Sequence, residues 1–135
     1  MSRYVVDART ILHLVGNDIR VDPSHQVVAP NAIRSQALQL LLQAVRRGEL
    51  TDEQALRQHE QLTELKMRLL GDRVSRRTAW KIARDMDWET IEAAEYLAIA
   101  KLQADALVTI DPTLASKALG IVPVAPLDAL VAEHD

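Results

Sequence analysis

Apolar residues follow two kinds of pattern along this chain, short continuous runs and longer segments with helical spacing. The continuous runs are typical of buried strands and lie at residues 3–8, 25–30, 105–112 and 121–126. A further run, at 66–71, fits either a strand or the end of a helix. The segments with helical spacing predict helices around 11–15, at 31–48, from about 51 to 66, and at 72–88, 90–104, 113–120 and 127–135.

The order of these segments predicts an α/β fold. Strands alternate with helices, and continuous apolar strands are typical of a parallel sheet that is covered on both faces. Gly48 and Gly120 follow two of the predicted helices, and Thr51 with Gln54 indicates a capped start for another. We therefore expect one domain over residues 1–135, built as a three-layer α/β/α sandwich with a small central parallel sheet.

Composition limits the function classes. The chain is 48% hydrophobic and 26% charged, and its apolar runs are much shorter than the roughly 20 residues that span a bilayer, so we expect no membrane partner. The absence of cysteine excludes disulfides and thiolate chemistry, and the start of the chain lacks a signal-peptide pattern; both favour a cytoplasmic protein. With a net charge of −3, contact with nucleic acid needs a local basic patch or bound metal.

Two aspartates are the first candidates for chemistry. Asp7 and Asp111 each end an apolar run, and ligands of open parallel sheets bind at the carboxyl ends of the strands. If the two strands are neighbours, the carboxylates lie side by side and suit Mg²⁺ or Mn²⁺, which prefer oxygen ligands. The alternative is that both residues only cap the helices that follow them, because Asp is a favoured N-cap.

Other candidate residues are less specific. The four histidines show no metal-ligand spacing, the serines lack a Gly-x-Ser-x-Gly context, and the four glycines form no phosphate-binding loop. The chain contains no Phe, two Trp and two Tyr, so few aromatic residues can stack on bases. The helix predicted at 72–88 and its flank carry a basic region, which is either a solvated helix face or a surface that faces RNA or an acidic partner.

Four segments together resemble a PIN domain of the VapC toxin type. They are "YVVDA" at 4–8, "VVAPNAIRSQAL" at 27–38, "AEYLAIAKLQADALVTID" at 94–111 and "GIVPVAPLDAL" at 120–130, and the resemblance covers nearly the whole chain. It implies an endoribonuclease that hydrolyses RNA with Mg²⁺ or Mn²⁺. It also implies a small antitoxin protein that occupies the cleft, and a homodimer to which the helices around 31–66 contribute apolar surface.

The resemblance assigns acids to four positions of one cleft. The first acid matches Asp7, and the fourth matches Asp111, with Thr109 two residues before it as in the family. The second acid falls on Gln36, and the third falls on Ala93. Gln36 keeps an oxygen ligand without its charge, whereas Ala93 keeps neither. Catalysis is therefore assigned to Asp7 and Asp111, and Gln36 and Thr109 are expected to line the cleft.

Three nearby side chains change this picture. Glu92 and Glu95 lie on the same predicted helix as Ala93, and a small rotation would bring Glu92 toward the cleft. We consider both, with the two aspartates, as metal ligands; the alternative is that both glutamates are solvated. Arg9 stands where the family usually has a small hydroxyl residue, and it either pairs with the acids, binds a phosphate directly or is an ordinary exposed arginine.

Three functions follow from these observations. The leading hypothesis is a VapC-like endoribonuclease toxin with reduced activity. The second is a catalytically impaired PIN module that binds RNA or an antitoxin-like partner without cleaving it. The third is an α/β domain that binds a small molecule and is unrelated to nucleic acid.

Overall fold

The computed structural model describes residues 2–131. Within this range the strands are β1 (Arg3–Val6), β2 (Gln26–Pro30), β3 (Met67–Leu70), β4 (Ala106–Val108) and β5 (Val124–Ala125). The helices are α1 (Ala8–Gly16), α2 (Ile33–Arg46), α3 (Asp52–Glu64), α4 (Arg73–Asp85), α5 (Glu92–Gln103) and α6 (Pro112–Ala118), with a 3-10 turn η1 (Leu127–Ala129).

The strands form one parallel sheet in the order β3-β2-β1-β4-β5. Val5 lies opposite Val28 on one side and Leu107 on the other, so β1 occupies the centre. The chain adds β2 and β3 on one side of β1 and later adds β4 and β5 on the other. The order of the strands therefore reverses between β1 and β4, which is where open sheets of this kind bind ligands.

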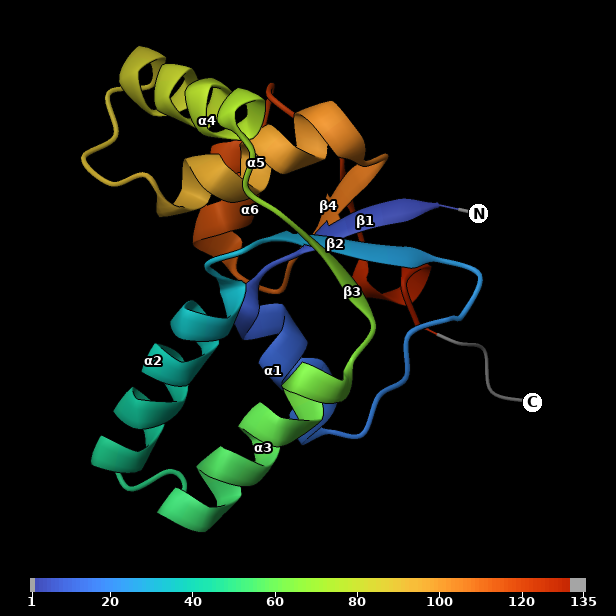
Figure 1. The fold of residues 1–135 in the computed structure, drawn as a ribbon, viewed down its shortest axis with the longest axis vertical. Helices are drawn as coiled ribbons and strands as arrows, with labels where there is room; N and C mark the ends of the chain where they lie inside the picture. The colour runs from blue at the N-terminus through green and yellow to red at the C-terminus, as the bar shows by residue number, and fades with distance from the viewer. Residues whose placement is uncertain (1, 132–135) are drawn as a thin grey trace.

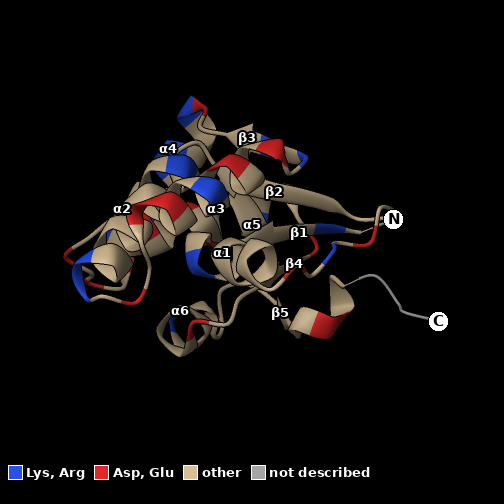
Figure 2. Cartoon of the chain, turned by 90° about the horizontal axis from the view of Figure 1, so that it is seen from below, with Lys and Arg blue, Asp and Glu red and all other residues tan. Residues whose placement is uncertain are grey.

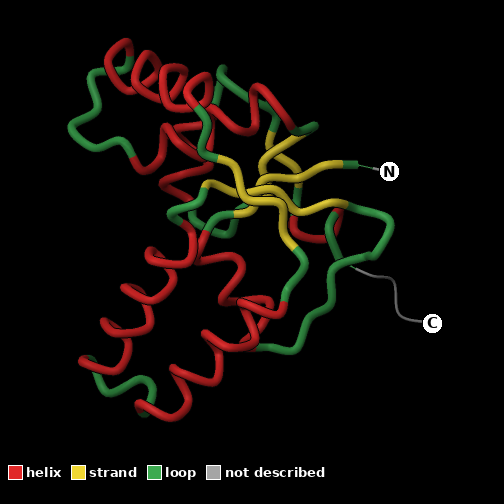
Figure 3. Tube along the Cα trace, in the orientation of Figure 1, coloured by secondary structure: helices red, strands yellow, loops and turns green. Residues whose placement is uncertain are grey.

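Helices cover both faces of the sheet, which confirms the predicted three-layer α/β/α architecture (Figures 1 and 3). α1, α2 and α3 pack together on one face, and α2 and α3 form a hairpin that extends away from the sheet (Figure 1). On the other face α5 contacts β1, β2 and β4, and it also contacts α4 and α6. Charged residues gather on the helices and loops around this core (Figure 2).

The burial pattern explains the elements. The central strands contribute fully buried residues such as Val5, Val28 and Leu107. The alanine-rich α5 is buried along most of its length, because small side chains let it pack closely between the sheet and α4. The expected capping box forms at α3, where the Gln54 amide donates to Thr51 Oγ1 at 3.1 Å and Gln54 Oε1 accepts from the Thr51 amide at 2.9 Å.

Several predicted boundaries differ in detail. The ambiguous segment at 66–71 is a strand, β3. The strand expected at 105–112 ends at Val108, and the one expected at 121–126 is reduced to β5. The helix predicted at 127–135 is only the η1 turn as far as residue 131, and residues 132–135 lie outside the described range. Gly48 and Gly120 follow α2 and α6 with φ of 77° and 78°, a backbone conformation that suits glycine at helix ends.

Among residues 2–131, no helix is both long enough and apolar enough to span a membrane.

Candidate functional site

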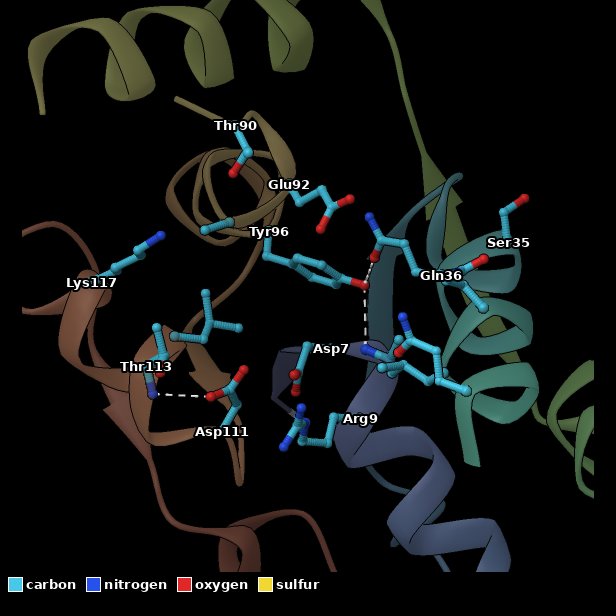
Figure 4. Close-up of a pocket in the computed structure, with 16 residues that line it drawn as sticks. Asp7, Arg9, Ser35, Gln36, Thr90, Glu92, Tyr96, Asp111, Thr113 and Lys117 are labelled. Atoms are coloured by element: carbon cyan, nitrogen blue, oxygen red, sulfur yellow. Dashed lines mark hydrogen bonds between the residues drawn. The ribbon is translucent and has the colours of Figure 1, made fainter. Parts of the chain in front are cut away.

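A cavity of about 760 Å³ lies at the edge of the sheet where β1 and β4 end. Asp7 follows β1 directly, and Asp111 follows β4 after two loop residues. Because these strands pair in parallel, with Val6 opposite Val108, the two aspartates reach the same edge. α1, α2, α5 and α6 supply the other walls of the cavity (Figure 4).

Asp7 is held inside the fold. It is only 5% exposed, and its Oδ1 accepts a hydrogen bond from the hydroxyl of Thr10. Thr10 Oγ1 in turn accepts from the Ile110 amide at 2.9 Å, so this threonine joins α1 to the loop that follows β4. Burial raises the pKa of the Asp7 carboxyl, and the negative charge of Asp111 adds to the rise, whereas the hydroxyls of Thr10 and Thr109 oppose it.

Asp111 is more accessible and caps a helix. Its Oδ1 accepts from the Thr113 amide at 2.9 Å at the first turn of α6, and its own amide donates to Thr109 Oγ1 at 3.0 Å. Helix capping, the role that the alternative gives to both aspartates, is therefore observed for Asp111. It is not observed for Asp7, whose side chain makes no capping hydrogen bond to α1. Thr109, expected in the cleft, supports Asp111 from behind and is not among the residues that line the cavity.

A tyrosine organises the opposite wall. Tyr96 on α5 is 4% exposed, and its hydroxyl donates to Gln36 Oε1 on α2. The same hydroxyl accepts from the Ala8 amide at 3.3 Å at the start of α1 (Figure 4). Burial, and then the charge of Asp7, raises the pKa of Tyr96 above its ordinary value. The phenol therefore keeps its proton and donates a hydrogen bond to Gln36 Oε1. The carbonyl oxygen of Gln36 is thus already engaged.

The glutamates next to Ala93 differ in their placement. Glu92 and Ala93 line the cavity, whereas Glu95 does not. Glu95 is partly buried, and this burial and the neighbouring charge of Glu92 raise the pKa of its carboxyl. The rotation expected to aim a glutamate at the cleft therefore concerns Glu92 alone, and the role of either residue as a metal ligand stays a prediction.

Two cations complete the cavity. Arg9 on α1 and Lys117 on α6 both line it. Arg9 is exposed, and it takes part in none of the ion pairs found within residues 2–131. The ammonium of Lys117 lies 5.0 Å from the centre of the Trp88 ring. Arg9 and Lys117 thus place positive charge on either side of Asp7 and Asp111, where an anionic phosphate would contact it (Figure 4).

The donor set fits a weakly held divalent cation. Mg²⁺ is often bound through one or two carboxylates together with substrate phosphates, and Asp7 and Asp111 provide such a pair. Across the described range 2–131, no group of three or more His, Cys, Asp or Glu side chains is placed to hold a metal ion. The residues therefore suit an ion that is bound jointly by the protein and a substrate phosphate. They do not suit an ion that is bound by protein ligands alone.

Sequence reasoning missed several residues of this cleft. The sequence patterns do not single out Thr10, Thr113 or Lys117, and Tyr96 appears only within the segment quoted for the family resemblance. The position of Thr10 one helical turn after Asp7 is a usable signal, since residues three apart on a helix are neighbours. The contact of Tyr96 with Gln36 joins residues 60 positions apart, and no local pattern indicates it.

Comparisons with known proteins bear on the fold that positions this cavity. No protein-family profile matches the chain, and no curated protein matches its sequence. The crystal structure of PAE2754 from Pyrobaculum aerophilum superposes with a TM-score of 0.72 at 20% identity, covering 95% of this chain and 92% of that one. The structure of VapBC-1 from nontypeable Haemophilus influenzae gives a TM-score of 0.58 at 15% identity, covering 92% and 97%. The chain therefore shares the fold of PAE2754 and of the VapBC-1 structure, as its resemblance to PIN domains of the VapC type implies.

The cavity contains the positions that the family resemblance singles out. Its lining includes all four positions to which the family resemblance assigns acids, namely Asp7, Gln36, Ala93 and Asp111. At the sheet edge, both acids are present. On the helical wall, the amide of Gln36 and the methyl group of Ala93 stand at the two other acid positions. The fold thus brings the expected positions together, and the chemistry of the site differs from the expected one on one wall.

Proposed function

We propose that this chain is a VapC-like endoribonuclease toxin that hydrolyses RNA phosphodiesters with Mg²⁺ or Mn²⁺, at reduced activity. The observation that carries the proposal is the meeting of Asp7 and Asp111 at the reversal of strand order, in a cavity that also presents Arg9 and Lys117. This combination suits a phosphodiester, because the carboxylates hold a divalent cation and the two cations contact phosphate oxygens.

Each wall of the cleft has its own part in this function. Asp7 and Asp111 would hold the ion, and Glu92 offers a further carboxylate on the helical wall. Gln36 would be a weakened ligand, because its carbonyl oxygen already accepts from Tyr96. When bound, Mg²⁺ or Mn²⁺ would lower the pKa of a coordinated water molecule and neutralise charge on the leaving oxygen. Thr10 and Thr109 fix the two aspartates, and Lys117 and Arg9 orient the phosphate. The reduction in activity follows from the missing charges at Gln36 and Ala93.

A second candidate function rests on the Gln36–Tyr96 hydrogen bond. This bond occupies the carbonyl oxygen that would otherwise serve as a third ligand. It favours a catalytically impaired PIN module that binds RNA or an antitoxin-like segment without cleaving it. The same cleft serves both functions, so they differ only in whether the bound RNA is cut.

Partners follow from the same proposal. A small antitoxin protein would occupy the cleft, as the VapBC-1 neighbour is named for such a pair. A homodimer would use the apolar residues that the α2–α3 hairpin exposes, Leu38, Leu42 and Leu56. Both partners, and a cytoplasmic location, are parts of the proposal.

An RNase assay with Mn²⁺ tests the proposal. Wild type, Asp7→Asn and Gln36→Glu are incubated with single-stranded RNA, and product ends are quantified. Slow cleavage by wild type that Asp7→Asn abolishes and Gln36→Glu increases supports the nuclease. If wild type is silent and Gln36→Glu gains activity, the impaired module is correct. If all three proteins neither cleave nor bind RNA, both functions are wrong.

A further inference from the structure

Helix α4 carries a surface that the proposed cleft chemistry does not use. Trp80 at its middle is 67% exposed, an unusual degree for the largest apolar side chain. Trp80 packs on neither the sheet nor α5, because the buried side of α4 is formed by Ser75, Ala79, Ile82 and Ala83. The exposed indole thus presents a flat aromatic surface to solvent at the centre of α4, and its neighbours decide what that surface suits.

Basic side chains surround Trp80. α4 carries five of the chain's 16 Lys and Arg residues and one acid, Asp85. Arg76 and Arg84 lie one turn before and one turn after Trp80 on the same face, and Arg77 lies beside it. We call Arg73, Arg76, Arg77, Trp80, Lys81 and Arg84 the α4 surface. Within residues 2–131 its single ion pair joins Arg84 to Asp85 at 3.6 Å, and both side chains are exposed.

The α4 surface differs from the rest of the molecule in its charge and in its exposed aromatic ring. The chain as a whole is negative, at −3, so a face with five cations and one anion runs against its overall charge. The other aromatic residues are engaged: Tyr4 packs edge-on against His25, Tyr96 is buried, and Trp88 lies under Lys117. Within residues 2–131, Trp80 is the one Trp or Tyr whose side chain is exposed, because Tyr4 and Trp88 are half-buried and Tyr96 is buried.

We propose that the α4 surface is a binding site for single-stranded RNA, in which a base stacks on Trp80 and the surrounding Arg and Lys residues contact phosphates. A flat base and a phosphate chain together match this surface, because single-strand binders combine stacking platforms with basic grooves. An acidic protein segment would match the charge but not the ring. A second copy of the chain would place like charges opposite one another across a two-fold axis.

The position of α4 connects this site to the cleft. α4 packs on α5, the helix that supplies Glu92 and Tyr96 to the cavity (Figure 1). Thr90, in the loop between α4 and α5, also lines the cavity. On the proposal, RNA that extends from the cleft along this loop would continue onto α4. The inference thus rests on RNA as the ligand of the proposed function, and it adds a second contact region that does not depend on metal or cleavage.

The test measures RNA binding without divalent ions. A labelled 12-nucleotide single-stranded RNA is titrated in EDTA by fluorescence anisotropy with wild type, Trp80→Ala, Arg77→Gln and Arg57→Gln. Arg57 is an exposed arginine of α3 and gives the same change of charge away from α4. We expect Trp80→Ala to weaken binding by about 5- to 150-fold, the range that stacking of one base provides. Arg77→Gln should reduce the slope of log K against log salt by about 0.7, and Arg57→Gln should change neither value.

Defined outcomes overturn the inference. Unchanged binding by Trp80→Ala, equal affinity for a duplex of the same length, equal competition by polyglutamate, or no RNA binding by wild type would each do so. Circular dichroism verifies that each variant is folded. A cleavage assay of wild type and Trp80→Ala with Mn²⁺ on the same RNA, run beside these titrations, separates this inference from the nuclease. Cleavage by wild type with no effect of Trp80→Ala on binding would defeat the α4 site alone, and loss of binding by Trp80→Ala in a protein that never cleaves would defeat the nuclease alone.

Discussion

The two walls of the cleft differ in how firmly the fold holds their polar groups. On the sheet edge, Asp7 is tied through Thr10 to the loop after β4, and Asp111 caps α6. On the helical wall, Gln36 and Tyr96 form a neutral pair, and Ala93 carries no polar group. The acids of the first wall therefore have structural work apart from any reaction, whereas the positions of the second wall have none that requires a charge.

This difference changes what the acids mean. Because Asp7 and Asp111 hold local structure, their presence alone does not demonstrate catalysis. The helical wall is more informative, because a carboxylate there would have no structural role and would serve only to attract a cation. The neutral Gln36–Tyr96 pair instead lowers the negative charge available to a cation, and experiments on this wall should therefore have the largest effect on ion binding.

The largest effect is expected when both missing acids are restored. Gln36→Glu with Ala93→Asp adds two carboxylates to the wall opposite Asp7 and Asp111. At an effective dielectric constant of about 20, a unit charge pair at 4 Å contributes on the order of 4 kcal/mol before desolvation, so the Mn²⁺ association constant should rise by at least about 100-fold. Isothermal titration calorimetry without RNA measures this value.

A matched variant tests whether position matters. Gln43 also lies on α2 and lines the cavity, and Gln43→Glu adds the same single charge as Gln36→Glu alone, two turns further along the helix, so these two single variants are compared. Gln43→Glu should leave Mn²⁺ binding nearly unchanged. An equal gain from Gln43→Glu would mean that bulk negative charge, and not the geometry of the two walls, controls the ion.

The second effect concerns the sheet edge. Thr10→Val removes the hydroxyl that joins the Asp7 carboxylate to the Ile110 amide, so the buried Asp7 carboxyl loses one of its two hydroxyl partners and the link from α1 to the loop after β4 is broken. We expect a loss of about 2–3 kcal/mol in the free energy of unfolding, measured with urea. Thr10→Ser keeps the hydroxyl and should cost less. A loss from Thr10→Val no larger than that from Thr10→Ser would show that the hydroxyl does not hold this edge.

The sequence predicts the sheet-edge wall of the cleft better than the helical wall. Asp7 and Asp111 follow apolar runs, and parallel strands end at one edge, so local patterns and one topological rule were sufficient to bring them together. The wall made by Gln36 and Tyr96 depends on how α2 and α5 are rotated against the sheet. That rotation is set by contacts of α5 with three strands and with α4, which no local periodicity encodes.

Strand boundaries show the same limit. The apolar pattern predicts a strand through Asp111, yet β4 ends at Val108 because Thr109 and Asp111 turn to hydrogen-bond each other and the start of α6. The last strand shrinks to Val124–Ala125 at the sheet edge, where only β4 pairs with it. Side-chain hydrogen bonds and edge position thus override an apolar run.

A smaller effect is expected at the helical wall. Tyr96→Phe removes the donor to Gln36 and the acceptor for the Ala8 amide while keeping the buried ring. The free energy of unfolding should fall by about 1–1.5 kcal/mol in urea denaturation, less than for Thr10→Val because no charged group loses its partner. Tyr4→Phe, at a half-buried ring beside His25, is the control and should change little. If Tyr96→Phe costs more than Thr10→Val, the ranking of the two walls is reversed.

The smallest effect compares two capping aspartates. Asp72 caps α4 as Asp111 caps α6, but it lies outside the cleft. The Ser75 amide, and then its hydroxyl, lower the pKa of Asp72 below the ordinary 3.8. Ionised Asp72 therefore stabilises the fold above pH 3.8, and this contribution is lost as the pH falls through the lower folded-state pKa. Thermal unfolding midpoints of wild type should approach or fall below those of Asp72→Asn as the pH is lowered in that range.

At neutral pH the two caps should behave alike in stability and differ in ion binding. Asn is also a favoured N-cap, so Asp72→Asn and Asp111→Asn should each shift the unfolding midpoint only slightly. In the background of Gln36→Glu with Ala93→Asp, Asp111→Asn should remove most of the gained Mn²⁺ affinity, and Asp72→Asn should remove none. If both substitutions leave that affinity intact, Asp111 is a helix cap and nothing more, and the sheet edge contributes a single acid, Asp7, to the cleft.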